Sequence, residues 1–303
     1  MRKHNRKNVR GGNKRYKWIF YLLLAALVVT FIFIYQFTKK NWDSKNKLSL
    51  AIKNQDGGVS LVTFDPISNE IITINIAGNT EVNVSENLGV WKLSSVWELG
   101  ESQGYSPKLL TKTITRSLKF PVYLYADSEA IGYSQANVIG IIKAASFPYK
   151  TNLHFIDKIS LGIFALKIKN PNRVSIDLTQ TSYLKFKKLA DGNEGYVVTK
   201  FFPTELLPVF ANFNFSKKTF NVLIIDASGQ HIAQDIAQVI EILGAKVASV
   251  DNVAQADFGC EVKGDDRRAQ EIISLLFACN KSPELPDNFD LQIKIGKEFA
   301  KSY

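Results

Sequence analysis

The sequence predicts a mixed α/β (α+β) protein with an N-terminal transmembrane helix and two domains outside the membrane. Residues 18–37, "WIFYLLLAALVVTFIFIYQF", contain no charged side chain, and a helix of this length spans the apolar core of a bilayer. The chain behind them combines short β-branched runs with stretches of helical periodicity. From residue 219 onward these patterns follow the order β-α-β-β-α-β, which is typical of a ferredoxin-like domain.

The positive charge of the chain is concentrated in its first 17 residues. The 303-residue chain has a net charge of +10, and residues 1–17 hold eight Lys and Arg side chains, with no acidic residue before Asp43. The rest of the chain is therefore nearly neutral. A basic tail in front of an apolar run favours a cytoplasmic N-terminus held against anionic lipid, so we expect no nucleic-acid partner.

Two alternatives to a membrane span over 18–38 have specific signatures. A cleaved signal peptide has a shorter apolar region followed by a small-residue cleavage site, whereas "QFTKK" follows here. A buried core helix is rarely uncharged over this whole length. We therefore expect a single-pass protein of the cell membrane, with 39–47 as a polar spacer and the bulk of the chain extracytoplasmic.

The first extracytoplasmic domain is expected over 48–215. "LSLAIK" predicts a strand, and "VSLVTFD" and "IITINI" predict a hairpin around a Pro-containing turn. The following segments predict, in order, helices over 92–100 and 106–118, a strand over 120–127, helices near 134–145 and over 151–170, and a strand over 172–178. The pattern weakens over 184–215, which we interpret as the joint between the domains.

The second domain is expected over 219–303. Its predicted elements are the strand "TFNVLII", the turn "DASGQ", the helix "HIAQDIAQVIEILG", the strands "KVASV" and "FGCEVK", the helix "DDRRAQEIISLLFA" and the strand "FDLQIKI". The first helix carries its apolar residues on one face and ends at Gly244. Two helices covering one face of a small sheet would give the ferredoxin-like arrangement.

Both domains resemble known families. Residues 219–300 resemble the LytR C-terminal domain, on "VLIIDASG", "ILGAKV" and "LQIKIGKEF". Residues 48–126 resemble the LytR-CpsA-Psr domain. That family has a strand ending in Asp-Pro, a turn, a strand and Ile-Pro-Arg-Asp-Thr, and this chain has "FDPISNEIITINIAGNT" in the same register. The later "KLSSVWELG", "SPKLLTKTITRSL" and "KFPVYLYAD" follow the family order as well.

The resemblance implies a glycopolymer transferase site, but its charged residues are missing here. Family members move a glycopolymer from a polyprenyl pyrophosphate carrier to peptidoglycan, and their chemistry uses Arg side chains on the pyrophosphate and Asp side chains on a divalent metal. The family's Arg-Asp pair falls on Gly78 and Asn79. Its earlier Arg-Ser-Asp-Thr falls on residues 55–58, which leaves Asp56 as one displaced carboxylate.

The other positively charged residues of this domain are too few to bind a pyrophosphate as the family's Arg residues do. Between residues 48 and 219 the Arg residues are Arg116 and Arg173, and Lys92 is a point charge without the planar fork of Arg. We therefore expect a degenerate, non-catalytic domain with no cofactor and no metal. It would bind or scaffold through peptidoglycan, a polyprenyl-linked glycan or an envelope protein. The alternative is a residual transferase or pyrophosphatase.

Two smaller features of the second domain have two interpretations each. The turn containing Ser228 and Gly229 could hold an anion on its backbone N–H groups, or Asp226 and Ser228 could simply cap the helix. Cys260 lies in a strand and Cys279 at the end of the following helix, so the pair could form a disulfide in an oxidising compartment. The alternative is two buried free thiols.

Overall fold

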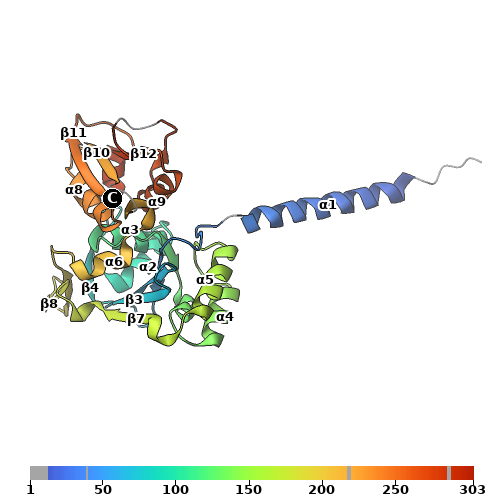
Figure 1. Ribbon diagram of the computed structural model, residues 1–303, viewed down its shortest axis with the longest axis horizontal. Coiled ribbons are helices and arrows are strands. Elements are labelled where there is room, and N and C mark those ends of the chain that lie inside the picture. Colours follow the sequence, from blue (N-terminus) through green and yellow to red (C-terminus); the bar gives the residue numbers. More distant parts are fainter. Residues whose placement is uncertain (1–12, 39, 217–219, 285–287) are drawn as a thin grey trace, which may run out of the picture.

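The computed structural model describes residues 13–38, 40–216, 220–284 and 288–303. Figure 1 shows two α/β bodies and a long helix, α1 (Asn13–Thr38), that leaves the larger body beside α5. Across the described ranges, no helix combines the length and the apolar character needed to cross a membrane. The span predicted over 18–38 is therefore not supported, and the basic residues of 1–12 lie outside the described residues.

The larger body is built on a five-stranded sheet, sheet A, with the strand order β6-β1-β2-β3-β7. The strands are β1 (Leu48–Lys53), β2 (Val59–Asp65), β3 (Glu70–Ile76), β6 (Leu124–Ala126) and β7 (Arg173–Asp177). β1, β2 and β3 form an antiparallel meander, and β6 and β7 add in parallel at the two edges. The central strand β2 is buried at every position, because helices cover both faces of the sheet.

The two faces of sheet A carry separate helical layers. One layer contains α2 (Leu93–Ser102) and α3 (Lys108–Ser117), which pack on Leu61, Ile74 and neighbouring residues. The other contains η1 (Ser128–Tyr133), α4 (Val138–Ser146) and α5 (Phe155–Lys167), which pack on Leu50, Phe64 and neighbouring residues. α5 begins four residues later than the predicted helix, since the Asp157 carboxylate accepts a hydrogen bond from the backbone N–H of His154 and caps the helix there.

A smaller four-stranded sheet, sheet B, has the order β5-β4-β9-β8. Its strands are β4 (Thr80–Val84), β5 (Gly89–Lys92), β8 (Leu184–Lys188) and β9 (Glu194–Val198). The central pair, β4 and β9, is parallel and joins segments more than a hundred residues apart. Two 3-10 turns, η2 (Asn170–Asn172) and η3 (Leu178–Gln180), flank β7, and η4 (Thr204–Leu206), α6 (Leu207–Phe210) and α7 (Phe213–Ser216) lead to the second body.

The second body contains the predicted elements in order, with a short strand β13 and a last helix α10 in addition, but its strands do not have the ferredoxin-like arrangement. Its elements are β10 (Asn221–Ala227), α8 (Ala233–Ile242), β11 (Lys246–Asn252), β12 (Cys260–Gly264), α9 (Arg267–Phe277), β13 (Asn280–Lys281), β14 (Leu291–Gly296) and α10 (Lys297–Ser302). The sheet order is β11-β10-β14-β12-β13. β10 and β11 are parallel immediate neighbours, whereas a split βαβ unit has another strand between them. α8 and α9 share one core on one face of the sheet.

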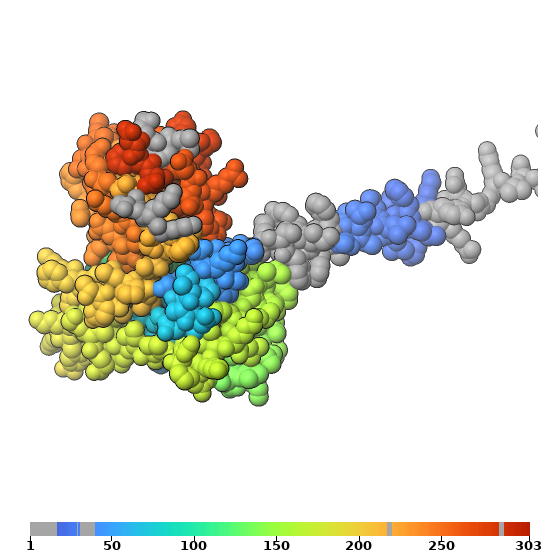
Figure 2. Space-filling model, viewed as in Figure 1, coloured from blue at the N-terminus to red at the C-terminus, as the bar shows by residue number. Residues whose placement is uncertain are grey.

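The two bodies are in direct contact, as the space-filling view also shows (Figure 2). The backbone N–H of Glu86 donates to the carbonyl of Ser302 over 3.1 Å. Lys119 Nζ lies 2.7 Å from Asp235 Oδ1, and Arg268 Nη2 donates to the carbonyl of Asn41 over 2.6 Å. The second body is thus attached to the first by charged and backbone contacts.

Candidate functional site

Gly78 lies in a tight turn between β3 and β4, where the backbone of another loop fills the space beside it. The backbone N–H of Thr80 donates to the carbonyl of Ala77 over 3.0 Å, which closes the turn. A Cβ atom added to Gly78 would lie 2.6 Å from the carbonyl oxygen of Gly57 and 2.8 Å from its carbonyl carbon. The 54–58 turn therefore occupies the place that any side chain at position 78 would need.

Asn79, in the same turn, forms hydrogen bonds to strand β9 of sheet B. Its carbonyl accepts a hydrogen bond from the backbone N–H of Tyr196 over 3.2 Å, and its side-chain amide donates to the carbonyl of Glu194 over 3.4 Å. Both partners belong to β9. The backbone of Asn79 therefore pairs with β9, and its side-chain amide points to the same strand.

Asp56 and Lys92 come near Gly78, since the fold brings three loops together. Asp56 is exposed, and its Oδ1 accepts from the backbone N–H of Gly58 over 2.9 Å. The carbonyl of Gly78 accepts from the backbone N–H of Ser94 over 3.0 Å, two residues after Lys92. The structure thus places four of the predicted residues, Asp56, Gly78, Asn79 and Lys92, in one neighbourhood.

Lys92 is paired with a carboxylate. Its Nζ lies 2.7 Å from Asp191 Oδ2. The hydrogen bond from Lys92, with two more from the side chain and backbone of Asn193, holds the pKa of Asp191 well below its usual range. The charge of Lys92 is therefore already balanced by an ionised neighbour.

Arg116 lies away from this loop, at the contact between the two bodies. Its Nη1 donates to the carbonyl of Val84 over 3.3 Å, and its guanidinium lies 5.8 Å from the ring centroid of Tyr303. It also lines an open hollow of 320 Å³ together with the carboxylates of Glu81 and Asp235. This arrangement favours a structural role for Arg116 between the bodies.

Arg173 lies on the opposite face of sheet A and stabilises the end of α5. Its Nη1 donates to the carbonyl of Tyr133 over 2.9 Å, and its Nη2 donates to the carbonyls of Ala165 and Ile168. Burial lowers the pKa of Arg173. Because Arg116 and Arg173 point to different partners, the structure does not assemble them into a pyrophosphate clamp.

The interior behind the Gly78 turn is filled. Ile74 and Ile76 of β3 pack with Leu93, Val96 and Trp97 of α2, and each of these side chains is at most 3% exposed. The neighbourhood therefore offers the exposed Asp56 carboxylate, the Asn79 amide and an ammonium group that is paired with a second carboxylate, Asp191. This set lacks the several positive charges that stabilise a transferring phosphoryl group.

The turn around Ser228 and Gly229 is occupied by its own aspartate. Asp226 Oδ1 accepts from the backbone N–H of Ser228 over 2.8 Å, and Oδ2 accepts from the backbone N–H of Ala233 over 3.1 Å. Ser228 Oγ accepts from the backbone N–H of Gln230 over 3.1 Å. These contacts correspond to the capping interpretation, because the N–H groups that an anion would use already donate to the protein.

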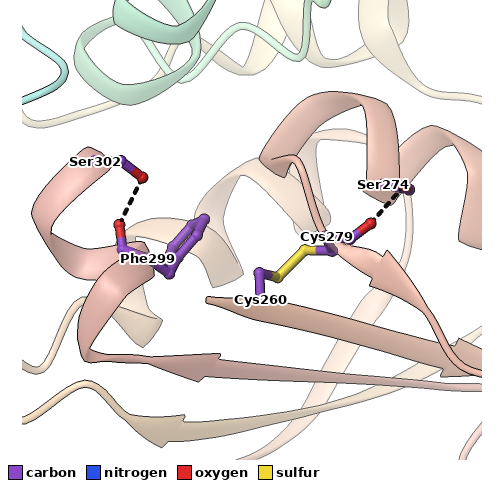
Figure 3. Close-up of a disulfide and its surroundings, with 5 residues drawn as sticks. All are labelled: Cys260, Ser274, Cys279, Phe299 and Ser302. Atoms are coloured by element: carbon purple, nitrogen blue, oxygen red, sulfur yellow. Dashed lines mark hydrogen bonds between the residues drawn. A yellow bond between two sulfur atoms is a disulfide. The ribbon is translucent and has the colours of Figure 1, made fainter. Parts of the chain in front are cut away.

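Cys260 and Cys279 form a disulfide, drawn in Figure 3. Their Cα atoms are 4.4 Å apart, and their positions in the chain differ by 19. The bridge ties β12 to the end of α9, and Ser274 Oγ donates to the carbonyl of Cys279 over 2.5 Å. Within the described residues, no group of three or more His, Cys, Asp and Glu side chains is arranged to hold a metal ion.

An open hollow of 570 Å³ lies at the C-terminal end of α2 and was not predicted from the sequence. Tyr125, Tyr149, Lys150 and Glu101 line it, with four further residues from the α2–α3 loop and position 151. Lys150 Nζ lies 2.6 Å from Glu101 Oε1, and burial raises the pKa of Tyr149 to about 12. The sequence signal is weak, because these residues come from three separate segments.

The sequence matches no protein-family model and no curated protein. The fold is similar to that of TagT from B. subtilis, with 17% sequence identity and a TM-score of 0.38 over 54% of this chain and 89% of TagT. TagU from B. subtilis gives 12% identity and a TM-score of 0.35 over 52% of this chain and 91% of TagU.

A third structure, the LytR-CPS2A-psr family protein YwtF (TagT) with bound octaprenyl pyrophosphate lipid, gives 16% identity and a TM-score of 0.37 over 54% of this chain and 88% of that protein.

Proposed function

We propose that this chain is a cell-envelope protein with a non-catalytic, LytR-CpsA-Psr-like domain that binds or scaffolds wall glycopolymer. The observation that carries the proposal is the contact at Gly78. The carbonyl of Gly57 lies 2.6 Å from where a Cβ would be, so position 78 has no room for the Arg that the family resemblance implies. Asn79 is used in strand pairing and Lys92 in an ion pair.

The disulfide supports a location outside the cytoplasm. Disulfides persist in oxidising compartments and are rare in the cytosol, and the bridge between Cys260 and Cys279 is buried within the second body. This fits the envelope location that we propose for the bulk of the chain.

The hollow lined by Tyr125 and Lys150 is the surface that we propose for glycan contact. It combines tyrosine rings with the Lys150–Glu101 pair, and such a set offers apolar faces together with hydrogen-bond donors and acceptors. The glycan is a wall polymer or its polyprenyl-linked precursor, as the family resemblance implies.

Equilibrium binding of the full chain to purified wall glycopolymer and to a polyprenyl-linked glycan analogue tests this proposal. We expect binding of one or both, weakened by Lys150→Ala. Lys263→Ala is the control, since Lys263 also pairs with a glutamate, Glu284, but lies on the second body and does not line the hollow. Absence of binding to both ligands, or equal weakening by both variants, would contradict the proposal.

A further inference from the structure

Helices α4 and α5 carry an exposed apolar surface that the proposed function does not use. It consists of Val138, Ile139, Ile142, Phe147, Ile163 and Leu166, which we call the α4–α5 face. Its five aliphatic side chains, Val138, Ile139, Ile142, Ile163 and Leu166, are 48–65% exposed. Other exposed apolar residues of this body, such as Ile67, Val90 and Phe201, lie on separate elements. A concentration of this kind marks an interaction surface.

The exposed residues of both helices point away from sheet A. α4 and α5 pack on the same face of the sheet and share one core, which contains Ile141, Ala145 and Leu161. Their outer sides therefore form one surface. Gly162 allows the close approach of the two helices, because a Cβ at this position would lie 2.8 Å from the Cβ of Ala145.

The exposed charges within α4 and α5 are positive. Lys143 lies in the last turn of α4 and Lys167 in the last turn of α5, and both are exposed, as is Lys169 just beyond. The one carboxylate of these helices, Asp157, is fully buried. An apolar helical face with lysines at its margin matches the interface of an anionic bilayer, where lysine ammonium groups reach the headgroups.

Helix α1 joins the body beside this face. α1 contacts α5, and Asp157 of α5 accepts hydrogen bonds from the backbone N–H groups of Asn41 and Trp42 over 2.9 and 3.0 Å. The Trp42 ring packs 5.5 Å from that of Phe164. The described apolar side chains of α1 are exposed, Leu23 and Leu27 each by 65%, and Figure 1 shows the helix extending from the α5 side.

We infer that the α4–α5 face lies on the surface of an anionic lipid bilayer. The apolar side chains enter the boundary between headgroups and acyl chains, and Lys143 and Lys167 contact anionic headgroups. The Asp157 contacts fix the start of the body against α5, so α1 with its exposed leucines begins beside this face. The hollow lined by Tyr125 and Lys150 is then held at a constant distance from the membrane.

The test uses the full chain in vesicles of phosphatidylglycerol and phosphatidylcholine, with an environment-sensitive fluorophore on a single introduced cysteine. Val138→Cys reports on the α4–α5 face. Val90→Cys on sheet B is the matched control, because the two valines are 56% and 60% exposed. The native cysteines are bridged and do not react. Nitroxide-labelled lipids then quench any label that enters the bilayer.

We expect a blue shift of the fluorophore emission at position 138 and lipid quenching at least twofold stronger there than at position 90. When Lys143 and Lys167 are both changed to Glu, we expect a smaller difference in quenching between the two positions. Equal quenching at the two positions, or none at either, overturns the inference. A blue shift at position 138 that grows with protein concentration in detergent, without lipid, also overturns it, since a second copy of the chain would then cover the face. None of these outcomes depends on whether the chain is an enzyme.

Discussion

Replacing Gly78 by Ala tests the steric argument at the turn between β3 and β4. The new Cβ would lie 2.6 Å from the Gly57 carbonyl oxygen, 2.8 Å from the Gly57 carbonyl carbon and 3.1 Å from the backbone nitrogen of Gly58. All three neighbours are backbone atoms, so no side chain can rotate away and the 54–58 turn must shift. Overpacking of this kind costs about 1–3 kcal/mol.

The assay is denaturant unfolding of the full chain, with the midpoint and slope compared between variants. Gly140→Ala is the control in the same body, because its Cβ would lie 3.5 Å or more from its neighbours and Gly140 lies within helix α4. We expect that control to be neutral or stabilising by up to about 1 kcal/mol. A loss below about 0.5 kcal/mol for Gly78→Ala would refute the claim that the turn fills this space.

Three further predictions concern stability. Replacing both Cys260 and Cys279 by Ser lowers the free energy of unfolding by roughly 3 kcal/mol, and an unchanged midpoint with and without reductant would contradict this. Arg173→Ala lowers the free energy of unfolding by about 2–3 kcal/mol, because buried carbonyls lose a charged hydrogen-bond donor. A decrease no larger than that caused by replacing an exposed residue would contradict a structural role for Arg173. Burial raises the pKa of Asp65, but the hydrogen bond and charge of Lys47 outweigh burial and lower the pKa overall. The contribution of Asp65 to the free energy of unfolding is therefore present above about pH 4 and lost as the pH falls further. Unfolding measured between pH 7 and 3 should show a smaller decrease of this free energy with acid in Asp65→Asn than in the unchanged protein.

The β1–β2–β3 meander of sheet A was predictable because its strands are apolar and pair with their neighbours in the chain. The predicted strands 48–53 and 59–65 coincide with β1 and β2, and 71–76 lies within β3. A Pro-containing turn fixes the β2–β3 hairpin, so sequence-local signals were sufficient.

Sheet B was not predicted because its strands lack these signals. β8, "LKFKK", is an exposed, lysine-rich edge strand, and β4 pairs with β9 across more than a hundred residues. The ferredoxin-like arrangement was wrong for a related reason. Element order does not determine strand order, and β14 pairs between β10 and β12.

The assignments at the candidate site stay predictions. The resemblance placed Gly78 and Asn79 at the family's Arg-Asp pair, but it gave no sign that the Gly57 backbone fills the space beside Gly78. Arg116 contacts Val84 and Tyr303, which lie 32 and 187 residues away from it in the chain. The role of Arg116 at the contact between the two bodies therefore required three-dimensional information. The hollow around Tyr125 and Lys150 required it as well.

Turnover by the full chain tests the central claim most directly. The purified protein, in excess over the substrate, is incubated with a polyprenyl pyrophosphate-linked glycan analogue and Mg²⁺. Pyrophosphate cleavage and glycan transfer are both measured against a protein-free control. Because the Gly78 turn has no space for an Arg and Lys92 is paired with Asp191, we predict product formation equal to the control. Product above the control that disappears with Asp56→Asn or Lys92→Ala would contradict the account and establish an active site at this turn.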